Sequence, residues 1–121
     1  MNNQDFKTLL IQRSKTFSLD IWKFLDNLPE NGFAVVIISK QLFRSATSIG
    51  ANVVEAQASS SKKDFTNFLY YALKSANETK YWLELFLEKQ GGNDQIHRLL
   101  KEADELSRIL GSVILKLKGR K

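Results

Sequence analysis

The sequence has no cysteine, and histidine occurs once, as His97. Without cysteine, disulfides and thiolate metal sites are excluded, which suits an intracellular protein. One histidine cannot supply a histidine metal cluster, or the paired Glu-x-x-His motifs of di-iron bundles, within a single chain. We therefore expect no metal or other cofactor, and we interpret His97 as a surface residue near the start of the last helix.

Long apolar runs are also absent. No segment approaches the roughly 20 apolar residues that span a bilayer, and the opening stretch MNNQDFKTLLIQRSK lacks the apolar core of a signal peptide. We expect a cytoplasmic protein with no membrane partner.

Signals for catalysis are missing too. No phosphate-binding glycine loop occurs, because Gly91-Gly92 is typical of a helix stop. Several carboxylates are interpreted as solvated helix faces, with no polar pocket to shift their pKa values, and no enzymatic activity is expected. They are Glu84, Glu88, Asp104 and Glu105.

What remains is a composition that favours helices. The chain has 121 residues, of which 43% are hydrophobic and 26% charged, as in one folded domain covering residues 1–121. One proline and six glycines leave room for long uninterrupted helices. Apolar residues recur every three or four positions in four segments, which we expect to be helices at about 5–28, 33–57, 62–89 and 93–118.

Two features of the second segment are ambiguous in the sequence. The run FAVVII at Phe33 could by itself be a buried strand, but the apolar series continues at helical spacing to Val53. Gly50 lies inside this second helix, where glycine costs about 1 kcal/mol relative to alanine. We expect it to mark the close approach of a neighbouring helix.

The third and fourth helices have clear start signals. Ser61 and Asp64 match a capping box, and Asn93 is a suitable N-cap. The fourth helix has a regular apolar seam, so it is either central to the bundle or shared with another subunit. Its residues are Ile96, Leu99, Ala103, Leu106, Leu110, Val113 and Leu117, with Leu100, Ile109 and Ile114 beside them. Short connections then predict an all-α, up-and-down four-helix bundle with left-handed packing.

Polar residues accompany the apolar stripes of the second and third helices. If these helices are antiparallel, residues whose numbers sum to about 120 lie opposite each other, which puts Arg44 level with Glu78 and Ser48 with Ser75. We interpret the set as a helix-pairing network, and we expect Arg44→Ala to unfold at clearly lower denaturant than an exposed control, Lys101→Ala. The network comprises Arg44, Ser48, Asn52, Glu55, Ser75, Glu78 and Trp82, with Gln41 on the same face.

The same stretch carries a family resemblance. The runs QLFRSATSIGANVVE (41–55), KDF (63–65) and SANETKYWL (75–83) resemble the family of the 23S rRNA intervening-sequence protein, although Ala56 stands where that family usually has glycine. The resemblance implies an up-and-down four-helix bundle, a ring-like homopentamer and no established enzymatic activity. It also implies similarity to the accessory variability protein of diversity-generating retroelements, a basic pentameric bundle that binds nucleic acid. Six network residues match the family pattern: Arg44, Ser48, Asn52, Glu55, Glu78 and Trp82.

Positive charge is concentrated late in the chain. The net charge is +5, and residues 62–121 hold twelve Lys and Arg against eight Asp and Glu. Such residues could contact phosphate, or they could simply cap a helix C-terminus. The aromatic residues near Lys62 and Lys63 could likewise stack on single-stranded nucleic acid, or could fill the core or a subunit interface. The possible nucleic-acid contacts are Lys62, Lys63, Lys116, Lys118, Arg120 and Lys121.

Two functions follow from this sequence. The first is a non-enzymatic homo-oligomeric bundle that binds RNA or DNA as an accessory protein through a basic surface. The alternative is a structural or protein-interaction module with a protein partner and no nucleic-acid role. Binding that weakens steeply with salt separates the two.

Overall fold

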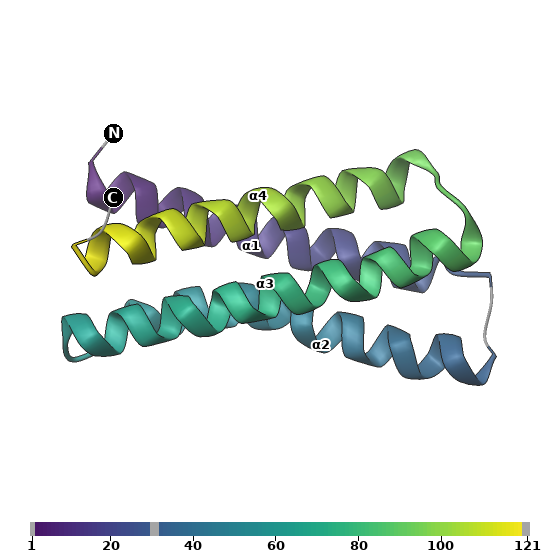
Figure 1. The fold of residues 1–121 in the computed structure, drawn as a ribbon, viewed down its shortest axis with the longest axis horizontal. Coiled ribbons are helices and arrows are strands. Elements are labelled where there is room, and N and C mark those ends of the chain that lie inside the picture. The colour runs from purple at the N-terminus through teal and green to yellow at the C-terminus, as the bar shows by residue number, and fades with distance from the viewer. Residues whose placement is uncertain (1, 30–31, 120–121) are drawn as a thin grey trace.

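Four long helices account for most of the fold in the computed structural model, which describes residues 2–29 and 32–119. They are α1 (Asn3–Asp26), α2 (Phe33–Ala56), α3 (Lys62–Gln90) and α4 (Asp94–Leu117). Consecutive helices run in opposite directions, and the start of α1, the end of α2, the start of α3 and the end of α4 lie at one end (Figure 1). The all-α, four-helix prediction is confirmed.

The helices pack as a closed cycle of neighbours. The contacting pairs are α1 with α2, α2 with α3, α3 with α4, and α4 with α1. The α4–α1 contact is much narrower than the other three. Because α4 packs against two neighbours like every other helix, its broad apolar face does not make it central to the bundle.

Helix ends follow the side-chain signals closely. The N-cap side chains of Asn2, Ser61 and Asn93 each accept a backbone N–H three residues on, at 2.8, 3.0 and 2.9 Å. The expected capping box is only half formed. The Asp64 carboxylate accepts from the Ser60 hydroxyl at 3.5 Å instead of from the backbone N–H of Ser61. At the other end of α3, Gly91 has φ of +82°, as a glycine stop requires.

The first helix is displaced from its expected bounds by two residues at each end. It begins at Asn3 because Asn2 caps it, and it ends at Asp26. Asn27 and Leu28 instead form a turn, in which their N–H groups donate to the carbonyls of Lys23 and Leu25. Residues just before a proline are biased away from helical conformation, which explains the early end. Residues 30 and 31 of the expected first turn lie outside the described residues.

The second helix resolves both local ambiguities. The run that begins at Phe33 is helical from its first residue. At Gly50, an added Cβ atom would lie 3.2 Å from the Cβ of Ser14 on α1, so the predicted close approach is confirmed. Ser14 is fully buried and its hydroxyl donates to the Leu10 carbonyl, which satisfies the polar group at this crossing.

The core lies along the bundle axis and includes the predicted seam of α4, with one shift. Leu106 and Leu110 are fully buried, but the seam then continues through Ile114, while Val113 is only partly buried. A straight α-helix drifts relative to a strict heptad by roughly 20° per repeat, so the inward position moves on by one residue.

Among residues 2–29 and 32–119, no helix is both long and apolar enough to cross a bilayer.

Candidate functional site

The polar contact between α2 and α3 is centred on Glu78. Arg44 Nη2 donates to Glu78 Oε2 at 2.7 Å, and the indole Nε1 of Trp82 donates to the same oxygen at 2.9 Å. Arg44 also donates to Gln41 Oε1 at 3.1 Å. The structure thus brings together three of the seven network residues, and it pairs Arg44 with Glu78 across the two helices.

This ion pair is more exposed than the sequence suggested. The side chains of Arg44 and Glu78 are 60% and 35% exposed, so water screens their attraction. We now expect Arg44→Ala to lower the free energy of unfolding by no more than about 1 kcal/mol, close to the effect of Lys101→Ala. Urea denaturation followed by circular dichroism measures both values. A loss above about 2 kcal/mol would mean that Arg44 stabilises the bundle more than an exposed pair can.

The other network residues do not reach across to the partner helix. The Ser48 hydroxyl donates to the Arg44 carbonyl, and the Asn52 amide donates to the Ser48 carbonyl, both within α2. Ser75 contributes its backbone carbonyl, which accepts from the Thr79 hydroxyl. Small polar side chains in helices are readily satisfied by the carbonyl four residues earlier, and this explains why they turn back. Glu55 lines a groove on the other side of α2.

A buried hydroxyl pair joins α2 and α3 instead. Thr79 Oγ1 lies 2.9 Å from Ser45 Oγ, and both residues are fully buried. Sequence reasoning missed this pair, although a signal was present. Ser45 follows Leu42 by three residues and precedes Ile49 by four, and Thr79 stands at the same spacings from Ala76 and Leu83. Both hydroxyl residues therefore occupy core positions.

Two further groups of ion pairs join helices through contacts that the sequence did not predict. Arg13 on α1 contacts two carboxylates on α4, with Nε and Nη2 at 2.9 and 2.6 Å from Glu102 and Nη2 at 2.7 Å from Glu105. Hydrogen bonds to Glu102, and then to Glu105, raise the pKa of Arg13 above its ordinary value. Glu105 lies on a solvated face as expected, with a side chain that is 43% exposed, and it also takes part in this ion pair.

The second group lies between α3 and α4. Asp104 contacts Lys80 at 3.3 Å and Arg108 at 2.7 Å, and Lys80 also donates to the Ser107 hydroxyl. The hydrogen bond from Arg108 is the main cause that holds the pKa of Asp104 below its ordinary value. Asp104 thus contacts a neighbouring helix while its side chain remains 42% exposed, which fits the expected solvated helix face. Glu84 and Glu88 are exposed.

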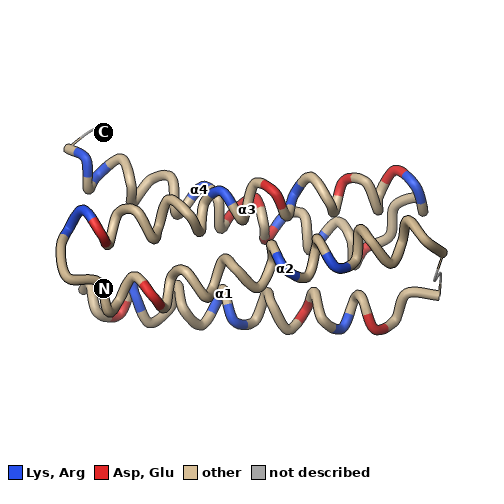
Figure 2. The backbone as a smooth tube through the Cα atoms, turned by 90° about the horizontal axis from the view of Figure 1, so that it is seen from below, with Lys and Arg blue, Asp and Glu red and all other residues tan. Residues whose placement is uncertain are grey.

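Basic residues lie where α3 begins and where α4 ends. Lys62 and Lys63 open α3, Lys116 and Lys118 lie at the end of α4, and Figure 1 places these two segments at the same end of the bundle. All four residues are exposed, and Figure 2 shows blue segments at this end with red ones beside them. We call these four lysines the basic end. Arg120 and Lys121 lie outside the described residues.

Apolar and aromatic side chains also remain on the surface. Tyr70, Tyr71 and Tyr81 on α3 are each about half exposed, so they do not fill the core of this chain, and the predicted alternative of a subunit interface stays a prediction. A groove of about 490 Å³ between α1 and α2 is lined in part by Leu19, Trp22 and Val54, which are themselves about half exposed.

No arrangement typical of a metal centre occurs among residues 2–29 and 32–119. Three or more His, Asp or Glu side chains are nowhere grouped there so that they could hold an ion. His97 is exposed, as expected. Part-exposed ion pairs link α1 to α4 through Arg13 and α3 to α4 through Lys80.

Comparison with known proteins identifies the family. The profile of the 23S rRNA-intervening sequence protein matches residues 7–112. A crystal structure of a protein with unknown function from the S23 ribosomal protein family of Bacteroides thetaiotaomicron is similar to this chain with a TM-score of 0.76 and 38% identity, over 87% of this chain and 97% of that one. No curated protein matches. The chain therefore belongs to the 23S rRNA-intervening sequence protein family.

Proposed function

We propose that this chain is a non-enzymatic, homo-oligomeric accessory protein of the cytoplasm that contacts nucleic acid through its basic end. The observation that supports the proposal is that the helix ends carrying Lys62 and Lys63 and carrying Lys116 and Lys118, more than fifty residues apart in sequence, lie at the same end of the bundle. Exposed lysines of this kind attract phosphates and release condensed counterions on contact. A ring of subunits would repeat the cluster around one rim and strengthen the attraction.

A salt titration tests the nucleic-acid contact. Fluorescence anisotropy with a labelled single-stranded RNA or DNA should show binding that weakens steeply between about 50 and 200 mM salt. Replacing all four lysines of the basic end by glutamine should lower the slope of log K against log salt by about 3 for each subunit that contacts the probe.

A matched variant separates this local effect from net charge. Its four substitutions, Lys23→Gln, Lys40→Gln, Lys89→Gln and Lys101→Gln, remove the same charge away from the basic end. We expect it to keep most of the salt dependence of the wild-type protein. Equal losses in the two variants, or no binding at low salt, would contradict the proposal.

The assembly is the second part of the proposal. The family resemblance implies a homopentamer, and the exposed groove between α1 and α2 offers apolar surface for contact between copies. Sedimentation equilibrium at micromolar concentration should give five chains, whereas a monomer would contradict the ring. Trp22→Lys in the groove should favour smaller species, and Leu115→Lys, at a comparably exposed site on α4, should not.

The alternative function is a protein-interaction module without a nucleic-acid role. It is favoured by the exposed tyrosines 70, 71 and 81 of α3, because tyrosine is enriched at protein interfaces. Lys74 Nζ lies 5.8 Å from the ring centroid of Tyr70, so this face is polar as well as aromatic. The same titration discriminates the two functions, since a pure protein-interaction module would bind no nucleic acid even at low salt.

A further inference from the structure

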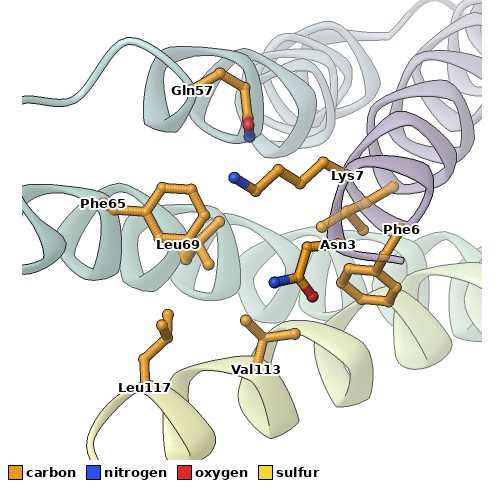
Figure 3. A pocket seen from close by; sticks show the side chains of 9 residues that line it. Asn3, Phe6, Lys7, Gln57, Phe65, Leu69, Val113 and Leu117 are labelled. Atoms are coloured by element: carbon orange, nitrogen blue, oxygen red, sulfur yellow. The ribbon is translucent and has the colours of Figure 1, made fainter. Parts of the chain in front are cut away.

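A cavity of about 310 Å³ opens near the basic end, lined by residues of α1, α3 and α4 and by Gln57 at the C-cap of α2. Its walls are mostly apolar, as Figure 3 shows, with Leu69 and Val113 on neighbouring helices. The size and the apolar lining match the lower end of small-molecule sites, which are roughly 300 to 1,000 Å³. The apolar lining consists of Phe6, Leu10, Phe65, Leu69, Val113 and Leu117.

Polar groups are confined to three side chains of this cavity. Figure 3 shows the Lys7 ammonium and the amides of Asn3 and Gln57 directed into the same space. Lys7 Nζ lies 5.2 Å from the ring centroid of Phe65, and it forms no ion pair with any carboxylate that the structure describes. A half-buried ammonium without a counterion beside an apolar cavity is complementary to one negative charge on an apolar body.

We propose that this cavity binds a small amphiphilic anion, a medium-chain carboxylate. Its carboxylate pairs with Lys7 and accepts from the amide of Asn3, while its chain lies against Leu69, Val113 and Leu117. A nucleobase fits these walls less well, because its polar edges would lose water and find partners on one side only. The proposal does not depend on nucleic-acid binding.

Titration calorimetry with decanoate tests the site. The wild-type protein should bind decanoate and should bind decyltrimethylammonium, which has a cationic head, at least tenfold more weakly. Lys7→Gln keeps the length of the side chain but removes its charge, so decanoate affinity should fall by about tenfold or more. Lys15→Gln is the matched control, because Lys15 lies on the same helix but lines the groove between α1 and α2. Its affinity for decanoate should equal that of the wild type.

A cavity-filling variant tests the position of the chain. Val113→Phe adds volume within the cavity, and it should abolish decanoate binding while circular dichroism shows an unchanged helical spectrum. In methyl NMR spectra, decanoate should shift Leu69, Val113 and Leu117. If Val113→Phe destabilises the fold, the methyl shifts of the wild-type protein still show whether decanoate lies in this cavity. The proposal is overturned if the shifts appear at Leu19 and Val54 in the other groove, or if the two amphiphiles bind equally.

Discussion

Gly50→Leu should lower the free energy of unfolding by about 3 kcal/mol, at the upper end of the range for overpacked sites. The new Cβ would lie 3.2 Å from the Cβ of Ser14, and neither atom can move by side-chain rotation because each is fixed to its own backbone. The helices α1 and α2 must therefore separate. The better helix propensity of leucine offsets only about 1 kcal/mol of this cost. Urea denaturation followed at 222 nm gives the value.

The control for this prediction is another helical glycine. Gly111 in α4 has no atom within 4 Å of a Cβ built on it, so Gly111→Leu should be neutral or slightly stabilising. A second control is Ser14→Gly, which removes the opposing Cβ and should make the Gly50→Leu penalty smaller. Equal stability of the Gly50 and Gly111 variants would show that the α1–α2 crossing is not tightly packed.

Leu106→Ala should cost about 3 kcal/mol, within the 2 to 5 kcal/mol found when buried leucines are truncated. Leu106 is fully buried in the seam of α4, and the cavity left by its removal would be closed only partly by neighbouring side chains. Leu115 on the same helix is 42% exposed, and Leu115→Ala should change the free energy of unfolding much less. Urea midpoints of the two variants should therefore differ clearly. Similar midpoints would mean that the interior of the bundle is loosely packed around α4.

The fold was largely predictable because its signals are local. Helix periodicity, the Ser61 and Asn93 caps and the interior Gly50 each depend on a few neighbouring residues, and the structure contains all of them. The pairing of Arg44 with Glu78 was within reach for a related reason. A short connection fixes the register of two antiparallel helices, so the sum of residue numbers predicts the level of each contact.

Rotation of a helix about its axis was harder to predict than register. Each residue turns the helix by about 100°, so the same level along the pair holds side chains that point inward and side chains that point outward. For this reason the register predicted that Ser48 lies opposite Ser75, whereas the buried contact joins Ser45 and Thr79. The ion pair of Arg13 with Glu102 spans 89 residues, and no local pattern could indicate it.

The placement of the four lysines at one end of the bundle could be predicted from the direction of each helix alone. The sequence identified Lys62 with Lys63 and Lys116 with Lys118 as separate groups. Alternating helix directions then put the start of α3 and the end of α4 together. The cavity beside Lys7, in contrast, depends on the shapes of side chains from several helices, and periodicity alone gives no information about such a space.

The narrow contact between α1 and α4 bears on how the chain folds. The three broad helix contacts join neighbours along the chain, so they close short loops and can form quickly. Only α1 with α4 joins segments separated by nearly the whole chain, and its loop-closure entropy is the largest. A chain that already contains the three consecutive hairpins has lost most of that entropy. We therefore expect the Arg13 ion pairs to form late in folding, so that Arg13→Ala should speed unfolding more than it slows refolding in stopped-flow measurements.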